Sequence, residues 1–364
     1  MPFYFAARWA QHISFEESLE NMENRSLTID ELASLAGVSK TTVSRVLNGK
    51  PDVKKETADR ILALIQETGY VPNIYAKAIN GKKPNTIGLV IPYSASYIFS
   101  SSYFSELLRG ISTNLDEHDY CLMLCYQNAN CTDYYRQGRV DAFIVITPDL
   151  RQTGFIDELL AAHIPFSLTS SIPKYQDRIP FVDLDDQGAA RTVVEYLISL
   201  GHKDIAFIGE DYSAASGMRL SAFKSCLLDH GITLRPEYVC LGGDDLISFG
   251  YSFAWELMTL PDPPTAIFCA ADMIAIGANR ALHKLDLKIP QQVSLVGFDD
   301  VFISQYLNPP LTTVHQSAFD RGYQVAEMLI QHLETGEQMQ GKKLDYQLVI
   351  RDSTVPPPAD RSTL

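Results

Sequence analysis

Several features are missing from this sequence of 364 residues. It contains no run of about 18 apolar residues, so we expect no membrane-spanning helix and no membrane partner. Residues 1–8 have one basic side chain and no small-residue cleavage site, which makes a signal peptide a poor description of them. The six cysteines form no CxxC pair. We therefore expect reduced thiols of a cytoplasmic protein rather than disulfides or zinc ligands.

Catalytic signatures are also missing. The chain has no GxSxG, no HExxH and no phosphate-binding loop. Its adjacent carboxylates Asp299 and Asp300 should point to opposite sides of a strand end. We therefore expect no catalytic residue, no metal ion and no cofactor.

Positive charge is scarce except in one short segment. The whole chain has a formal net charge of −14. Residues 26–83 carry nine basic and six acidic side chains, whereas residues 84–364 carry 19 basic and 34 acidic ones. A small basic segment attached to an acidic body is typical of a protein whose head binds nucleic acid.

The basic segment has the pattern of a small all-α head over residues 26–72. Thr28 is the expected N-cap of a first helix, which Gly37 ends, and Ser39 is the expected cap of a second. A third helix is expected over about 56–68. The predicted inward positions are Leu32, Leu35, Ala36, Val43, Val46, Leu47, Ala58, Ile61, Leu62 and Ile65. Two short helices joined by a glycine turn form a helix-turn-helix.

The second helix of such a motif enters the DNA major groove with its first residues at the base edges. Arg45 can bind a guanine with two hydrogen bonds, Lys40 can reach a guanine or a phosphate, and Thr41 can contact a thymine methyl group. The alternative is that Lys40 and Arg45 are solvated charges on an ordinary three-helix bundle.

The residues themselves favour the first interpretation. The stretch Leu-Ala-Ser-Leu-Ala-Gly-Val-Ser-Lys-Thr-Thr-Val-Ser-Arg-Val-Leu-Asn at 32–48, and Gly-Tyr-Val-Pro-Asn at 69–73, closely resemble the head of the lac/gal repressor (LacI/GalR) family of bacterial transcriptional regulators. The resemblance implies DNA contacts by Thr28, Ser39, Lys40, Thr41, Thr42, Ser44, Arg45, Asn48, Tyr70, Asn73, Ala76, Lys77 and Ile79. It also implies double-stranded palindromic operator DNA as the partner of a homodimer. The tail at 355–364 has no heptad repeat that could join dimers into tetramers.

Residues 73–84 are expected to form a hinge helix and a linker. Residues 73–80 are too few to stay helical alone in water, so they should fold only on docking. In the family resembled, this hinge helix inserts an apolar side chain into the minor groove, and Ile79 has that position here. The alternative is a plain flexible linker. Residues 1–25 precede the head, match nothing in the family and are expected to be dispensable.

Residues 85–354 alternate apolar strands with helical stretches. The expected strands are 86–91, 121–126, 140–146, 165–169, 204–209, 238–242, 265–271 and 293–299. This alternation predicts parallel sheets covered on both faces, and the number of units fits two doubly wound lobes. Ligands of such folds bind beyond the carboxyl ends of the strands.

The resemblance extends over this body, which is similar to periplasmic sugar-binding proteins. It implies a two-lobed α/β effector domain, with lobe 1 at about 85–183 and 315–344 and lobe 2 at about 187–310 and 345–354. The lobes would be joined by crossovers near 183–187, 308–315 and 344–348. Matching pieces include Leu-Gly-His-Lys-Asp-Ile-Ala-Phe-Ile-Gly at 200–209 and Val-Ser-Leu-Val-Gly-Phe-Asp-Asp at 293–300.

The effector contacts follow from the same resemblance. Arg219 and Asp299 match effector-binding residues, and together they suit vicinal hydroxyls in a dry cleft. The alternative for each is an interlobe salt bridge. Tyr103 and Phe104 match an aromatic pair that lines the cleft, although they could equally be core residues. Two further contact positions are Ser170, where sugar responders often have an acid, and Asp245, where an aromatic is common.

These features together predict a DNA-binding transcriptional repressor of carbohydrate-utilisation genes, controlled by a bound sugar or phosphosugar. A sugar-active enzyme and a free solute-binding protein are the alternatives. Operator binding in a gel shift would discriminate between them. The effector's identity, and whether it induces or co-represses, stay open.

Overall fold

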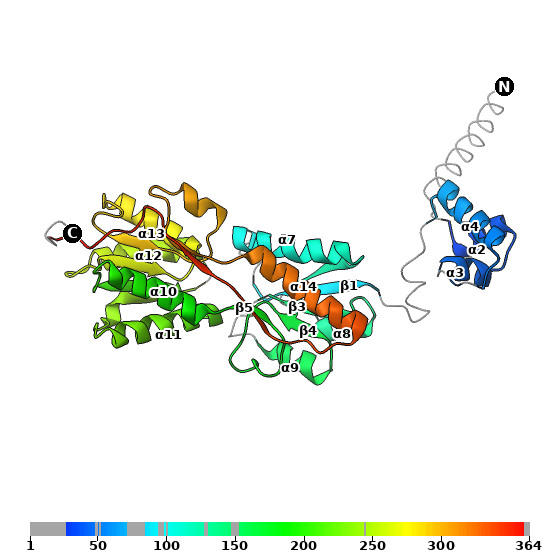
Figure 1. Cartoon of the computed structure of the whole chain (residues 1–364), viewed down its shortest axis with the longest axis horizontal. Helices are drawn as coiled ribbons and strands as arrows, with labels where there is room; N and C mark the ends of the chain where they lie inside the picture. The colour runs from blue at the N-terminus through cyan, green and yellow to red at the C-terminus, as the bar shows by residue number, and fades with distance from the viewer. Residues whose placement is uncertain are drawn as a thin grey trace, which may run out of the picture. The chain divides into compact units, whose positions relative to one another are not determined.

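The computed structural model describes residues 27–47, 50, 52–70, 84–93, 98–99, 101–126, 130–146, 153–243 and 245–359. The chain divides into two compact units, Met1–Pro84 and Asn85–Leu364 (Figure 1). Among these described residues, no helix combines the length and apolar character needed to cross a membrane. The predicted hinge residues 73–83 and the first 25 residues lie outside the described ranges.

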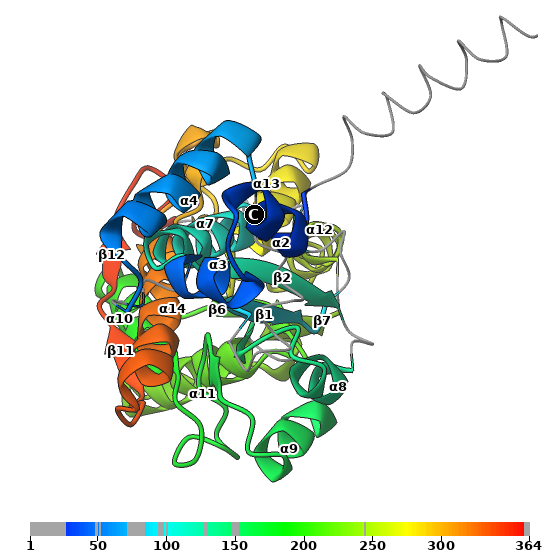
Figure 2. The same cartoon turned by 90° about the vertical axis from the view of Figure 1, so that its right-hand side faces the viewer.

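The first unit contains the three predicted helices, α2 (Ile29–Ala36), α3 (Lys40–Leu47) and α4 (Lys55–Thr68) (Figure 2). The predicted capping box is confirmed, because the Glu31 N–H donates to Thr28 Oγ1 at 3.3 Å while the Thr28 N–H donates to Glu31 Oε2 at 2.7 Å. Gly37 ends α2 with a φ of 64°, a left-handed conformation that glycine adopts without a steric penalty.

Two of the predicted inward positions are wrong. Leu35 and Leu62 are 58% and 49% exposed. Successive residues of an α-helix turn by about 100°. The buried stripe of α2 therefore includes Ala33 beside Leu32, and Leu35 lies on its flank. In α4, Leu64 packs against the small core of the head in place of Leu62.

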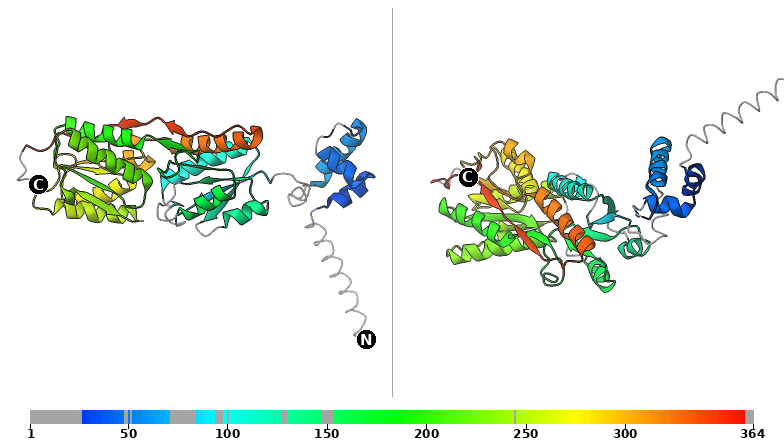
Figure 3. Two further views of the ribbon diagram at one scale, coloured as in Figure 1. Left: turned by 90° about the horizontal axis from the view of Figure 1, so that it is seen from below. Right: turned by 45° about the vertical axis from the view of Figure 1, so that its right-hand side comes forward.

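The second unit has two lobes, each built around a four-stranded parallel sheet, as predicted (Figure 3). The sheet of lobe 1 has the order β2-β1-β3-β4. Its strands are β1 (Thr86–Ile91), β2 (Cys121–Tyr126), β3 (Ala142–Val145) and β4 (Phe166–Leu168). Its helices are α7 (Ser102–Glu117), α8 (Cys131–Arg136), α9 (Gly154–Ala161) and α14 (Ala318–Thr335). Gly110 and Gly322 bring α7 and α14 together, because a Cβ at either would lie about 2 Å from a backbone oxygen of the facing helix.

The sheet of lobe 2 has the order β7-β6-β8-β9. Its strands are β6 (Ile205–Glu210), β7 (Val239–Gly242), β8 (Ala266–Cys269) and β9 (Ser294–Val296). Its helices are α10 (Asp186–Ser199), α11 (Ala214–Asp229), α12 (Leu246–Met258) and α13 (Asp272–Lys284). Short 3-10 helices η1 (Pro236–Tyr238) and η2 (Phe302–Tyr306) complete the lobe. The predicted doubly wound architecture is therefore confirmed.

Four short strands lie where the chain passes from one lobe to the other. β5 (Val182–Leu184) pairs in parallel with β11 (Lys342–Leu344). β10 (Thr313–His315) pairs antiparallel with β12 (Gln347–Val349). A change in the angle between the lobes must therefore be accommodated in these crossing strands and in the side chains that they carry.

Candidate functional site

The predicted recognition surface of the head is the exposed face of α3. Val43 is fully buried, whereas Lys40, Thr41 and Arg45 are exposed. Lys40 Nζ lies 2.9 Å from Asp30 Oδ2, and Arg45 Nη1 lies 3.1 Å from Asp52 Oδ2. Exposed ion pairs of this kind contribute about 0–1 kcal/mol. Both cations can therefore exchange their carboxylate partners for a base edge or a phosphate at little cost.

Other residues predicted to bind DNA have structural partners in the head. Ser39 Oγ accepts from the Thr42 N–H at 3.2 Å and thereby caps α3. Tyr70 is only 7% exposed and packs in the head core. Ser44 is half-buried on α3. The predicted contacts Asn48, Asn73, Ala76, Lys77 and Ile79 lie outside the described residues.

A cavity lies between the two lobes, beyond the carboxyl ends of the strands. Lobe 1 contributes Tyr93, Tyr103 and Phe104 to its wall, and lobe 2 contributes Glu210, Arg219 and Asp299. Its volume is about 70 Å³, which is smaller than the ~300–1,000 Å³ of typical small-molecule sites. A sugar-sized ligand therefore requires movement of the lobes or of the side chains that line them.

Arg219 is held rigidly on the lobe 2 side of this cavity. Its Nε donates to Asp186 Oδ1 at 2.7 Å, its Nη2 lies 2.7 Å from the same oxygen, and its Nη1 donates to the Ala270 carbonyl oxygen at 2.5 Å. The guanidinium lies 3.5 Å from the centre of the Phe298 ring. A guanidinium has five N–H donors, so these contacts leave two for a ligand.

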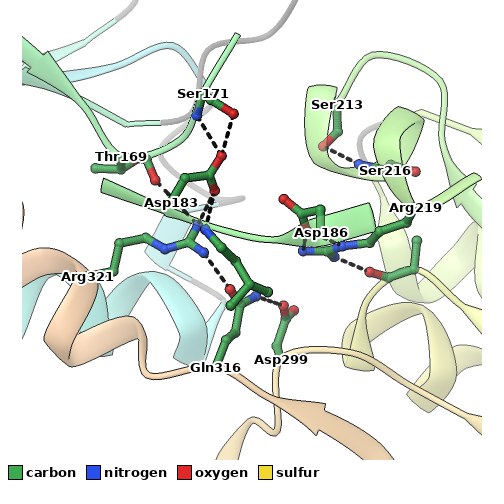
Figure 4. Close-up of polar contacts among 12 residues, drawn as sticks. Thr169, Ser171, Asp183, Asp186, Ser213, Ser216, Arg219, Asp299, Gln316 and Arg321 are labelled. Carbon is green, nitrogen blue, oxygen red and sulfur yellow. Dashed lines mark hydrogen bonds and ion pairs between the residues drawn. The ribbon is translucent and has the colours of Figure 1, made fainter. Parts of the chain in front are cut away.

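Arg321 occupies the lobe 1 side. Its Nη2 donates to Gln316 Oε1 at 2.7 Å, and its Nη1 lies 3.3 Å from the Thr169 carbonyl oxygen and 3.6 Å from Asp183 Oδ1. Asp183 also accepts from the Ser171 N–H at 2.7 Å. In Figure 4, Asp183 points toward Arg321 and Asp186 points toward Arg219. One crossing segment thus supplies a carboxylate to each of the two arginines.

Asp299 follows β9 in a conformation with a φ of 112°, which few non-glycine residues adopt. Its Oδ1 accepts from the Gln316 side-chain amide. Burial raises the pKa of Asp299 to about 6, although nearby Arg219 opposes that shift. The Asp300 carboxylate points away from that of Asp299, and its Oδ1 accepts from Arg351 Nη2 at 2.6 Å. The predicted divergence of the two carboxylates is therefore confirmed.

The remaining effector candidates occupy different places. Tyr103 lines the cavity, and burial raises its pKa to about 12, so its hydroxyl remains a donor at neutral pH. Phe104 both lines the cavity and packs in the lobe 1 core. Ser170 is 1% exposed and outside the described cavity lining. Asp245, also outside that lining, caps α12 by accepting from the Ser248 N–H at 3.1 Å.

Sequence reasoning missed four charged residues of this site, namely Asp183, Asp186, Glu210 and Arg321. Glu210 could have been found, because it directly follows the predicted strand 204–209, where ligand contacts are expected. The two aspartates lie in a predicted crossover. Arg321 is within a long amphipathic helix, and no local pattern marks it.

Comparisons with known proteins agree with this architecture. Residues 28–73 match the model of bacterial regulatory proteins of the lacI family, and residues 194–354 match a periplasmic binding protein-like domain. The probable HTH-type transcriptional repressor ExuR of Bacillus subtilis is 33% identical over 330 residues, which cover 90% of this chain and 98% of that protein.

Two solved structures are similar over the same extent. The transcriptional regulator CelR in complex with cellobiose has a TM-score of 0.68 and 26% identity, covering 90% of this chain and 99% of that one. The lac repressor dimer bound to operator and the anti-inducer ONPF has a TM-score of 0.77 and 25% identity, covering 91% and 100%. This chain therefore belongs to the lacI family of bacterial regulatory proteins and is a helix-turn-helix transcriptional regulator.

Proposed function

We propose that the protein represses carbohydrate-utilisation genes as a homodimer on a palindromic operator in the cytoplasm. A sugar bound between the lobes controls its affinity for that operator. The observation that carries this proposal is the interlobe cavity, where a guanidinium and a carboxylate, Arg219 and Asp299, converge from lobe 2. Such a pair can donate to and accept from vicinal hydroxyls. The proposal includes no catalytic role, and the cellobiose complex of the similar regulator CelR supports a sugar ligand.

The proposed allosteric route passes through the crossing strands. Asp183 and Asp186 connect one crossing segment to an arginine on each side of the cavity. An effector that binds one arrangement of the lobes more tightly than the other shifts the equilibrium toward the first arrangement. The difference between its two binding free energies sets the size of that shift. We propose that this shift reaches the operator through residues 73–84, acting as a hinge.

A gel shift on DNA from upstream of the protein's own gene tests the proposal. The protein should retard this DNA, and one sugar from a panel of pentoses, hexoses and disaccharides should change the midpoint of retardation. Retardation that no sugar alters would contradict the proposed effector class. Absence of retardation would contradict the proposed operator.

Arg45→Ala should weaken specific operator binding by about 1–3 kcal/mol, because a bidentate contact with a base contributes that much discrimination. Effector binding should not change. The matched control is Arg60→Ala, which removes an exposed cation from α4 instead of α3. Fluorescence anisotropy with operator and scrambled duplexes measures both variants. An unchanged operator affinity for Arg45→Ala would refute the assigned recognition face.

Phe302→Asp should convert the homodimer into monomers at micromolar concentration. Phe302, Ile303 and Tyr306 on η2 are 70%, 45% and 63% exposed, and a cluster of exposed apolar side chains commonly marks a protein interface. Burying a new carboxylate in that interface would be costly. Analytical ultracentrifugation reads the result. Leu228→Asp alters an equally apolar side chain, 76% exposed on α11, and should remain a dimer.

A further inference from the structure

We propose that the effector carries no negative charge and that it donates hydrogen bonds to Glu210 as well as to Asp299. This inference rests on the proposed sugar effector and narrows its chemical class to neutral sugars and amino sugars. It also adds Glu210, at the end of β6, to the contact residues.

The charges around the cavity are unbalanced among the described residues. Two guanidinium groups, those of Arg219 and Arg321, face the carboxyl groups of Asp183, Asp186, Glu210 and Asp299. Asp186 neutralises Arg219 at 2.7 Å, and Asp183 lies 3.6 Å from Arg321. Among the described residues, Glu210 and Asp299 then remain as two carboxyls with no cation paired to them directly, although the charge of Arg219 opposes the rise in the pKa of both.

These carboxyls also have unfilled acceptor positions. No hydrogen bond or ion pair joins the Glu210 carboxylate to another side chain in the described part of the chain, and its backbone N–H is fixed by Ser216 Oγ at 2.9 Å. Asp299 Oδ1 has one donor, Gln316. Asp186 Oδ2 is buried without a hydrogen-bond partner among the described residues. The wall is therefore rich in acceptors, and a complementary ligand is rich in donors.

Each oxygen of an ionised carboxylate can accept hydrogen bonds but cannot donate them. A sugar hydroxyl or ammonium group satisfies such an oxygen, whereas a phosphate or carboxylate brings further acceptors and like charge into a water-poor site. Burial raises the pKa of Glu210 to about 7 and that of Asp299 to about 6, which is the expected response of carboxyls that lack donors. At pH 8 both groups are mostly ionised, and discrimination against anions is then at its strongest.

The test is isothermal titration calorimetry of the full chain at pH 8 with matched ligand sets. Each set consists of a neutral aldose, its 2-amino derivative, its uronic acid and its 6-phosphate. We use the glucose, galactose and mannose sets, with cellobiose and cellobionic acid as a disaccharide pair. In the set that binds, the neutral or amino sugar should bind at least tenfold more tightly than either acid. Tighter binding of the uronic acid or the phosphate would overturn the inference.

Glu210→Gln examines the assigned residue directly. Glutamine has nearly the same shape and keeps one acceptor oxygen, so the neutral sugar should still bind, while its tenfold advantage over the acids should fall severalfold or more. Asp211→Asn is the matched control, because Asp211 is exposed and outside the described cavity lining. Thermal unfolding without ligand confirms that both variants fold. An unchanged ratio of affinities in Glu210→Gln would remove Glu210 from the site.

The possible outcomes distinguish a failure of this inference from a failure of the proposed sugar effector. Binding of acids alone contradicts the inference and leaves a carbohydrate effector in place. Binding of no member of any set contradicts the proposed sugar effector and the inference with it. Binding of a neutral sugar that Arg219→Ala does not weaken would place the sugar outside this cavity and would contradict both.

Discussion

Arg219→Ala is expected to leave operator binding in place and to lower effector affinity about a hundredfold. Arg219 has two N–H donors that its contacts with Asp186 and Ala270 do not use. Hydrogen bonds from a charged donor contribute about 1.5 kcal/mol or more each, and two of them amount to roughly a factor of 10² in affinity. Without differential binding, the effector cannot shift the lobes, so induction or co-repression should be lost as well.

The measurement combines calorimetry with the responsive sugar and operator anisotropy on the same preparation. Asp299→Asn should resemble Arg219→Ala in direction, because it removes a charged acceptor while keeping the side chain's shape. Arg191→Ala is the control, since Arg191 binds Glu195 and Asp229 on the outer surface of lobe 2. A normal effector response in both cleft variants would place the effector site elsewhere.

Arg219→Ala also removes the only ion-pair partner that Asp186 has among the described residues. Burial already raises the pKa of Asp186, and Arg219 is the largest opposing influence. The alanine variant should therefore lose stability, so its unfolding midpoint must be measured beside its affinity. The double variant Arg219→Ala/Asp186→Asn removes the uncompensated carboxylate. It should recover stability without recovering effector binding, which separates a folding defect from a missing contact.

The sequence predicts local structure well where the interactions that determine it lie within a single helix or strand. The capping box at Thr28 and Glu31 and the left-handed Gly37 are properties of a few neighbouring residues. The strands β1 and β2 have the predicted bounds, 86–91 and 121–126. Each depends on interactions that are close in the chain or on a simple apolar pattern.

Prediction fails where partners are distant in the sequence. Arg321 and Asp183 are more than a hundred positions apart, and only the packing of α14 beside a crossing strand brings them together. Leu35 has the same apolar character as the buried Leu32, yet the angle at which α2 packs leaves it exposed. Local periodicity in the sequence indicates neither which residue a charged side chain will pair with nor how a helix will be oriented against its neighbours.

Asp272→Ala is expected to lower the free energy of unfolding by about 3 kcal/mol or more. Asp272 begins α13 and is fully buried. Its carboxylate accepts from Thr313 Oγ1 at 2.6 Å, from the Val301 N–H at 2.9 Å and from Ser304 Oγ. These donors belong to β10 and to the region around η2. The Asp272 side chain therefore connects its own helix α13 to both of these segments. Removing it leaves three buried donors unsatisfied, each costing about 1–3 kcal/mol. Urea unfolding of the full chain, followed by tryptophan fluorescence and circular dichroism, measures the loss.

Asp272→Asn is the informative companion, because it should cost much less than the alanine variant. The Thr313 hydroxyl can turn and accept from the new amide, while the amide oxygen keeps the Val301 N–H and Ser304 donors.

The pH dependence adds a second readout. Burial raises the pKa of Asp272 to about 7, above the ~3.9 of an unperturbed aspartate. The folded state thus holds this proton more tightly than the unfolded state, so the contribution to stability is complete below about pH 4 and is lost as pH rises through about 7. The asparagine variant cannot titrate at this position. The wild-type protein should therefore lose stability relative to Asp272→Asn between pH 4 and pH 8, and parallel pH profiles for the two proteins would show that Asp272 does not hold a proton in the fold.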